Sequence, residues 1–220
     1  MLVAEVMKCI EVRNLRVSYD GLSWVLEDVD LEIACGELVI VASRSGGGKT
    51  TLLRSLAGLI PWFYPCKVQG SVRVLDTDVL RTRPDKLLGY VGFVSQNPST
   101  QLVAPTVLDE VREVLLNVGY SYGEATRRTE EILTDFGLQD YRDQEPWRLS
   151  LGLQQKLAIA AALALDPPVL LLDEPFAYLD PGEVKHLTNL LSLLKKRGCL
   201  LYTSDAADEL DGVDLGGRRI

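Results

Sequence analysis

The stretch from Val39 to Leu53 constrains the fold of this chain more than any other part of it. It begins with an apolar, β-branched run, Val39-Ile40-Val41, which predicts a buried strand. Three glycines follow at 46–48, then Lys49-Thr50-Thr51 and apolar residues at helical spacing. A strand, a glycine-rich loop and a helix in this order are typical of a P-loop. A glycine-rich turn with a chance lysine is the alternative, and the flanking strand and helix argue against it.

The residue types in this loop suit a bound phosphate group. Glycine lacks a Cβ, so successive backbone N–H groups can curl around phosphate oxygens, and the helix that follows points the positive end of its dipole at the same anion. In such a loop Lys49 would reach the β- and γ-phosphates, and the Thr50 hydroxyl would hold Mg²⁺. Ser43 stands where the pattern has its first glycine, so we expect a strained but usable loop.

The segment from Val169 to Pro175 is the second strong signal. Four apolar residues followed by Asp173 and Glu174 predict a buried parallel strand that delivers two carboxylates to the C-terminal edge of a sheet, where open α/β sheets bind ligands. Asp173 would position Mg²⁺ or its water ligands, and Glu174 would accept a proton from an attacking water. An acidic turn after a strand is the weaker alternative.

Three isolated residues carry less certain signals. Gln96 follows the strand-like segment 90–94, where it would ligate Mg²⁺ or orient a water, although on its own it is only a turn residue. The ring of Tyr19 would stack on an adenine, and local packing explains this residue equally well. His186, the only histidine, lies in a predicted helix and is interpreted as a residue on that helix face.

The rest of the chain predicts an α/β fold with an antiparallel beginning. Alternating residues predict strands at 9–17 and 25–33, and further strands are expected at 71–75, 90–94 and 199–203. Residues 61–70 predict an ordered loop, and 212–220 predict no further element. Helices are expected at 49–57, from 107, at 123–136, from Ser150 to about 165, and at 183–196. The helical stretch between 107 and 165 has the size of an inserted subdomain.

Composition and charge exclude several classes of protein. The chain has 220 residues, 47% of them hydrophobic, which suits one large globular domain. Its 31 acidic and 23 basic residues give a net charge of −8, which argues against a dedicated nucleic-acid-binding protein. We expect no signal peptide within 1–13, and the most apolar run, 157–172, is interrupted by Asp166-Pro167-Pro168. Any membrane role would therefore come through a partner.

The four cysteines are scattered along the chain, at Cys9, Cys35, Cys66 and Cys199, without a C-x-x-C pair. This spacing predicts reduced, mostly buried thiols of a cytosolic protein. It predicts neither a metal site nor a disulfide.

Taken together, the motifs resemble the nucleotide-binding subunit of an ATP-binding-cassette (ABC) transporter over nearly the whole chain. Residues 43–51 match the family's Walker A motif, 149–155 its signature and 169–174 its Walker B motif, while Tyr19 matches the aromatic A-loop and Gln96 the Q-loop. Residues 96–107 are similar to energy-coupling-factor and cobalt-type importer ATPases. The resemblance implies the cofactors ATP and Mg²⁺.

The resemblance assigns a role to each matching residue. The nucleotide-binding residues are Tyr19, Ser43, Arg44, Ser45, Gly46, Gly47, Gly48, Lys49, Thr50 and Thr51. The residues implied in catalysis are Glu174, Gln96 and Ser204. The residues implied in Mg²⁺ binding are Thr50, Gln96 and Asp173, and Asp180 belongs to the D-loop. The signature, which meets the ATP of the opposite site, contributes Ser150, Leu151, Gly152 and Leu153.

The family also implies a fold and partners. The fold is a RecA-like P-loop NTPase core with an antiparallel β subdomain and an inserted helical subdomain. Residues 1–220 would form a single ABC ATPase domain, in which 1–106 and 166–220 form the core with its β subdomain and 107–165 the helical signature subdomain. Two such subunits sandwich two ATP molecules head to tail. A transmembrane subunit binds in a groove near the Q-loop, which implies a peripheral location at the cytoplasmic face of the cell membrane.

Two positions depart from the family pattern. The signature reads LSLGL, with Leu151 and Leu153 in place of glycine and glutamine, and Ser204 stands where the switch histidine is expected. Both changes argue against fast hydrolysis, but Lys49 and Glu174 are in place for ATP binding and catalysis.

Three hypotheses follow. The first is an ATPase subunit that powers uptake of a vitamin or a metal ion through a membrane partner. The second is a degenerate subunit that binds ATP, hydrolyses little and pairs with an active sister ATPase, so that a heterodimer is favoured over a homodimer. The third is a soluble ABC-type ATPase that acts on nucleic acid. The excess of acidic over basic residues and the lack of a long coiled coil argue against this third hypothesis, so we expect no nucleic-acid partner.

Overall fold

An antiparallel sheet forms one side of the molecule. The computed structural model describes residues 7–177, 179–194, 199–205 and 218–219, and only the backbone of 193–194, 199–201, 204–205 and 218–219. The strands of this sheet are β1 (Lys8–Ser18), β2 (Leu26–Ala34), β4 (Lys67–Val74) and β5 (Thr77–Asp78), in the order β2-β1-β4-β5. Apolar residues alternate along β1, and Ile10 and Val12 are fully buried on the face that packs against the rest of the protein.

A parallel sheet lies at the centre, in the order β6-β7-β8-β3-β9. Its strands are β3 (Leu38–Ser43), β6 (Val91–Val94), β7 (Val169–Leu172), β8 (Cys199–Asp205) and β9 (Arg218–Arg219). All the pairings between them are parallel. β7 and residues 38–42 of β3 are apolar because helices or the second sheet cover both faces of the parallel sheet. The strands therefore bring their C-terminal ends to one edge.

The helices are α1 (Lys49–Leu56), α2 (Val107–Asn117), α3 (Tyr122–Asp135), α4 (Leu151–Leu163) and α5 (Pro181–Leu194). Short 3₁₀ turns lie at Pro84–Lys86, Pro98–Thr100, Gln139–Tyr141 and Pro146–Arg148. The expected N-cap is present, because Ser150 Oγ accepts a hydrogen bond from Leu153 N at the start of α4. In the described part of the chain, we find no helix that combines the length and the apolarity needed to cross a membrane.

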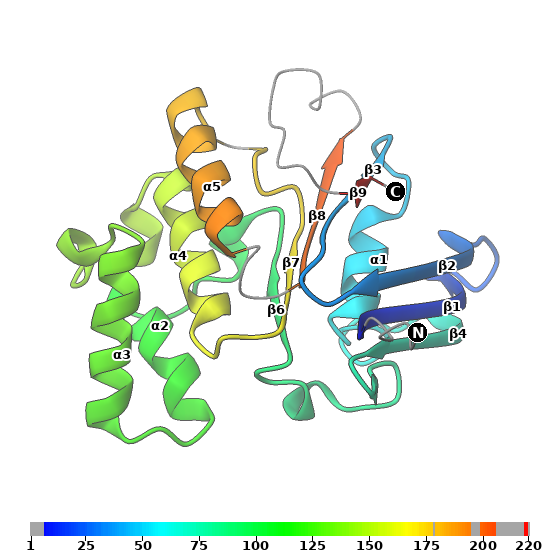
Figure 1. Ribbon diagram of the computed structural model, residues 1–220, viewed down its shortest axis with the longest axis horizontal. Coiled ribbons are helices and arrows are strands. Elements are labelled where there is room, and N and C mark those ends of the chain that lie inside the picture. The colour runs from blue at the N-terminus through cyan, green and yellow to red at the C-terminus, as the bar shows by residue number, and fades with distance from the viewer. Residues whose placement is uncertain (1–6, 178, 195–198, 206–217, 220) are drawn as a thin grey trace, which may run out of the picture.

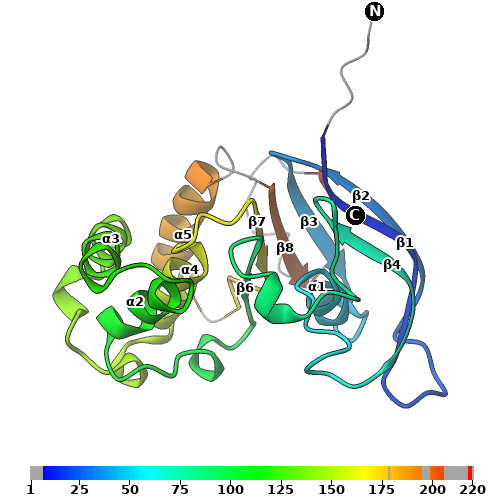
Figure 2. The same ribbon diagram turned by 90° about the horizontal axis from the view of Figure 1, so that it is seen from below.

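The elements form layers. In both views α1 lies between the antiparallel sheet and the parallel sheet, while α4 and α5 cover the other face of the parallel sheet and α2 and α3 lie beyond them (Figures 1 and 2). One apolar cluster joins the antiparallel sheet to α1 and the parallel sheet. A second lies between β7 and α5, and a third joins α2, α3 and α4. The P-loop helix is thus held on both sides by hydrophobic packing.

Two local predictions are wrong. Residues 61–70 were expected to form a loop, but β4 begins at Lys67 because Ser18 and Val17 of β1 pair with Lys67 and Val68. The C-terminal residues were expected to add no element, but Arg218 and Arg219 pair with β3 as β9. In both places the segment becomes a strand because it pairs with a strand far away in the sequence. Local composition does not predict such pairing.

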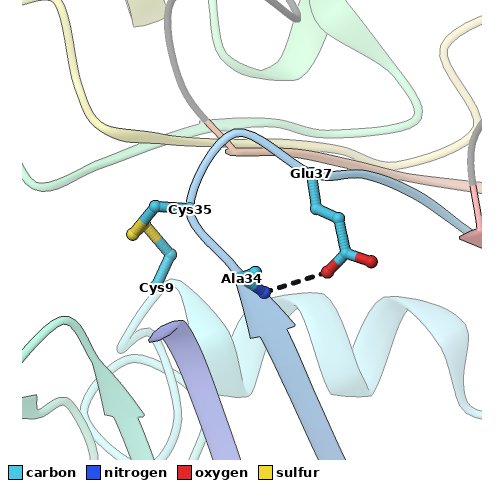
Figure 3. The surroundings of a disulfide bond; sticks show 4 residues. All are labelled: Cys9, Ala34, Cys35 and Glu37. Atoms are coloured by element: carbon cyan, nitrogen blue, oxygen red, sulfur yellow. Dashed lines mark hydrogen bonds between the residues drawn. A yellow bond between two sulfur atoms is a disulfide. The ribbon is translucent and has the colours of Figure 1, made fainter. Parts of the chain in front are cut away.

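The prediction of reduced cysteines is also wrong. Cys9 and Cys35 form a disulfide with Cα atoms 4.8 Å apart (Figure 3). Cys35 follows β2 in the turn that leads to β3, and its backbone N–H donates to Met7 O at 2.9 Å. Antiparallel pairing of β1 with β2 brings two cysteines together that are 26 residues apart. Cys66 is a free thiol whose pKa is raised by burial, and the side chain of Cys199 lies outside the described residues.

Candidate functional site

The P-loop connects the end of β3 to the start of α1. Gly46 and Gly48 have φ of 79° and 86°, which non-glycine residues rarely adopt, and Gly48 is the N-cap of α1. A Cβ at Gly47 would collide with Ser43 Oγ and lie 3.0 Å from Arg44 O. A side chain at Gly47 would therefore collide with the loop itself, and we call residues 43–51 the glycine cradle. Ser43, which stands in place of the pattern's first glycine, ends β3 without a positive φ.

The other predicted loop residues belong to this cradle. Arg44 and Ser45 are exposed in the loop, and Thr50 is the second residue of α1. Thr51 is buried, with its hydroxyl 3.3 Å from the Tyr19 hydroxyl. Tyr19 is 41% exposed and so keeps part of its surface available beside the P-loop helix.

The turn after Tyr19 is held by one carboxylate. Asp20 accepts hydrogen bonds from the Ser23 hydroxyl, from Ser23 N and from Leu22 N. These bonds lower the pKa of Asp20, and the bond from the Ser23 hydroxyl has the largest effect. The turn that presents Tyr19 is therefore built on a charged carboxylate at neutral pH.

Lys49 links the P-loop to the second motif. Its side chain is only 4% exposed, and Nζ donates to Ser43 O at 3.2 Å. The same Nζ lies 3.5 Å from Glu174 Oε1. The ammonium group therefore lies at the glycine cradle, between the end of β3 and the carboxylate that follows β7.

Glu174 is the residue on which the site converges. It directly follows Asp173 after β7 and has a φ of 47°. Gln96 Nε2 donates to Glu174 Oε2 at 2.7 Å, so a residue that follows β6 contacts a residue that follows β7. Asp173 is 2% exposed, and Oδ1 accepts a hydrogen bond from the Thr203 hydroxyl at 2.9 Å.

Strand register explains this convergence. Val94 of β6 is level with Leu172 of β7, so Gln96 and Glu174 are each two residues beyond a matched pair. On the other side, Ser204 of β8 is level with Ala42 of β3, just before the P-loop. The backbone of Ser204 therefore lies at the same edge, and its side chain lies outside the described residues.

The signature residues lie at the start of α4, away from the P-loop of the same chain. In both views α4 and α1 are on opposite sides of β7 and β8 (Figures 1 and 2). Leu151 is 44% exposed. A Cβ at Gly152 would collide with Glu183 Oε1, so the backbone at the start of α4 lies against the end of this side chain of α5.

The D-loop residue Asp180 caps α5. Its Oδ1 accepts from Glu183 N at 2.8 Å, and its own N–H donates to Glu183 Oε2 at 3.2 Å. Glu183 thus contacts both the D-loop and the signature glycine Gly152. The sequence motifs do not reveal the approach of Glu183 to Gly152, nor the bond between Thr203 and Asp173, because each joins segments that are far apart along the chain.

Three of the predicted site residues could hold Mg²⁺ beside a bound nucleotide. Thr50, Gln96 and Asp173 would offer hard oxygen ligands, which Mg²⁺ prefers. Among the described residues, no cluster of three His, Cys, Asp or Glu side chains could hold a metal ion. Phosphates of a bound nucleotide would complete the ligand set of Mg²⁺, and the glycine cradle would hold those phosphates.

Comparisons with known proteins agree with this geometry. The sequence pattern of the ABC transporter family matches residues 26–177. A protein of Saccharolobus solfataricus named as an ABC transporter ATP-binding protein is 36% identical over 198 residues, which are 89% of this chain and 37% of that protein. The energy-coupling factor transporter ATP-binding protein EcfA1 of Leuconostoc mesenteroides is 33% identical over 213 residues, which are 96% of this chain and 76% of that protein.

A solved structure gives the same result. The structure of cbiO1 from Clostridium perfringens, described as part of the ABC transporter complex cbiONQ, superposes with a TM-score of 0.79 at 26% identity. The match covers 92% of this chain and 80% of that one. The chain therefore belongs to the ABC transporter family, and the predicted fold class is confirmed. The resemblance to energy-coupling-factor and cobalt-type ATPases is confirmed as well. The chain spans little more than a third of the length of the Saccharolobus relative.

Proposed function

We propose that this chain is the ATP-binding and ATP-hydrolysing subunit of an importer, which powers uptake of a vitamin or a metal ion through a membrane partner. The observation that carries the proposal is the convergence of Lys49 and Gln96 on Glu174, which joins three motifs at the edge of one parallel sheet. Relatives named as energy-coupling factor transporter proteins support the importer class.

ATP would bind with its phosphates in the cradle formed by residues 43–51. Backbone N–H groups and the start of α1 favour the negative charge, and Lys49 supplies a charge partner in a buried position. The ring of Tyr19 would stack on the adenine. Mg²⁺ would be held by Thr50, Asp173 and Gln96, and when bound it would neutralise charge on the phosphates.

Glu174 would act as the general base for hydrolysis. The oxygen of a water attacks the γ-phosphorus while its proton passes to the Glu174 carboxylate, and the bond to the ADP oxygen breaks. Gln96, whose amide already contacts this carboxylate, would orient the same water. The side chain of Glu174 is 17% exposed, so the base is reachable yet mostly shielded from solvent.

The membrane partner would dock in a groove between the parallel sheet and the helices. Its lining is mainly apolar and includes Phe93 of β6, Val114 of α2 and Ala162 of α4. Leu88, which precedes β6, and Leu102, which precedes α2, add to the apolar part. Gln101, five residues after Gln96, also lines it. An apolar groove next to the Q-loop suits a short helix of a transmembrane subunit. Such docking would hold the chain at the cytoplasmic face of the cell membrane.

We also propose the division of the chain at 107 and 165. The supporting observation is that α2, α3 and α4 share an apolar cluster, whose buried members run from Val107 to Ala164. Within this division, 1–106 and 166–220 form the core with its β subdomain, and 107–165 form the helical signature subdomain.

The second subunit of the dimer would be a different ATPase. Leu151 and Leu153 replace the signature glycine and glutamine, and Leu151 is 44% exposed at the start of α4. Ser204 replaces the switch histidine at the edge of the sheet. These changes favour a heterodimer, and they keep open the second function, a degenerate ATP-binding subunit paired with an active sister ATPase.

The variant Glu174→Gln tests the proposed function. It should bind ATP as the wild type does but stop turnover, because an amide does not accept the proton from water. Glu131→Gln on the exposed face of α3 is a matched control that should leave both unchanged. Binding is measured with a fluorescent ATP analogue, turnover by phosphate release, and the ATP-bound dimer by size-exclusion chromatography. Wild-type turnover in Glu174→Gln would show that Glu174 is only an acidic turn residue.

A further inference from the structure

Thr203 bridges the two carboxylate residues that follow β7. It lies in β8, is fully buried, and neighbours β7 in the parallel sheet. Its hydroxyl donates to Asp173 Oδ1 at 2.9 Å and accepts from the backbone N–H of Glu174, also at 2.9 Å. A single hydroxyl therefore uses both its donor and its acceptor capacity on two consecutive residues.

The bond to Glu174 fixes the point at which the chain leaves the sheet. β7 ends at Leu172, and Glu174 turns with a φ of 47°, which is uncommon for a residue other than glycine. Its N–H points at Thr203, and a buried N–H needs a partner. This turn directs the Glu174 side chain toward Lys49 and Gln96.

The bond to Asp173 fixes one oxygen of a buried carboxylate. Asp173 is 2% exposed, and the Thr203 hydroxyl holds Oδ1 from the β8 side. Groups that orient a metal-binding carboxylate from behind are part of a metal site, since a rotated carboxylate presents its oxygens in the wrong direction.

We propose that Thr203 is a positioning residue for the hydrolysis reaction, because its hydroxyl keeps the Mg²⁺-binding carboxylate and the general base in one fixed relative geometry. The inference rests on the proposed roles of Asp173 and Glu174. The opposing interpretation is that Thr203 merely fills space in the sheet, and in that case its methyl group matters and its hydroxyl does not.

The variants Thr203→Val and Thr203→Ser separate these two interpretations. Valine keeps the shape and loses the hydroxyl, while serine keeps the hydroxyl and loses the methyl. Thr129→Val is the matched control, because Thr129 is also fully buried, lies in α3, and its hydroxyl makes no hydrogen bond. Thr203→Ala and Thr203→Ser differ only by the hydroxyl, so this pair decides the question if the valine variant does not fold.

Three quantities are measured on the full chain: the single-turnover rate of phosphate release, the Mg²⁺ concentration for half-maximal rate, and the affinity for ATP in EDTA. Thr203→Val should lower the rate by roughly 10- to 100-fold and raise the Mg²⁺ requirement by a similar factor, which is the usual loss for a group behind a metal ligand. Its affinity for ATP in EDTA should stay within about twofold of the wild-type value, which counts as unchanged beside a loss of roughly 10- to 100-fold. Thr203→Ser and Thr129→Val should behave as the wild type.

Two results would overturn the inference. In one, Thr203→Val retains the wild-type rate and Mg²⁺ requirement. In the other, serine is as damaging as valine or alanine, so that the hydroxyl is not the cause. Both results are read against a wild-type chain whose single-turnover rate, although slow, is lost in Glu174→Gln. If Glu174→Gln keeps the wild-type rate, the proposed function itself fails, and the two failures are thus distinguishable.

Discussion

Gln96 donates a hydrogen bond from Nε2 to Glu174 Oε2 at 2.7 Å, although the two residues are 78 positions apart. The contact exists because β6 and β7 are neighbours in the parallel sheet and end level with each other. It places the amide after one strand and the carboxylate after the next at the same point of the sheet edge.

Lys49→Ala should abolish ATP binding. The side chain is 4% exposed and lies at the glycine cradle, so its removal deletes a buried charge partner for phosphate. Lys86→Ala is the control, because Lys86 is largely exposed on a 3₁₀ turn and should bind ATP normally. Equilibrium titration with a fluorescent ATP analogue measures both. An unchanged affinity in Lys49→Ala would refute the P-loop assignment.

Tyr19→Ala should weaken ATP binding by roughly 1–3 kcal/mol, by analogy with base stacking on aromatic side chains. Tyr19→Phe loses only the hydroxyl contact with Thr51, and Tyr19→Trp keeps a stacking surface, so both should be mild. The same titration gives the three affinities. Equal losses for alanine and tryptophan would favour local packing as the role of Tyr19.

The purified chain alone should bind ATP and hydrolyse it very slowly. In a head-to-tail dimer this chain contributes Ser204 to one site and Leu151 with Leu153 to the other, so a homodimer carries both changes in both sites. Losing one transition-state contact costs roughly 2.7–4 kcal/mol, or about 100- to 1,000-fold in rate. A leucine at 151 also adds a Cβ where backbone must approach phosphate.

Steady-state ATPase assays test this prediction with Ser204→His, with Leu151→Gly/Leu153→Gln, and with the combined variant. The combined variant should be fastest, with a gain beyond that of either change alone. Normal turnover by the wild-type chain alone would mean that both departures are tolerated and that no heterodimer is required.

Reduction of the Cys9–Cys35 disulfide should destabilise the protein by about 3–4 kcal/mol, because the bond closes a loop with a sequence separation of 26 in the unfolded chain. Urea unfolding with and without a reducing agent measures the difference, and Cys35→Ser should match the reduced wild type. Cys66→Ser is the control, since Cys66 is a free thiol. Peptide mapping that finds Cys9 and Cys35 alkylated without prior reduction would contradict the bond.

Much of the candidate site could be predicted from the sequence because its parts are local. The turn of the P-loop needs glycine at Gly46 and Gly48, whose left-handed conformations other residues rarely adopt. The apolar run 169–172 ends in carboxylates, and this pattern indicates a buried strand that points at a ligand edge. The N-cap at Ser150 is a contact between near neighbours in sequence. Each of these features depends on backbone sterics or on hydrogen bonds within a few residues.

The tertiary structure alone decided which distant segments meet. The order β6-β7-β8-β3-β9 joins Gln96 to Glu174 and Thr203 to Asp173, and antiparallel pairing joins Cys9 to Cys35. None of these pairs has a fixed spacing along the chain, so no local pattern contains them. Strand order depends on burying apolar faces of the whole domain at once, and this global requirement determines which side chain stands behind each functional residue.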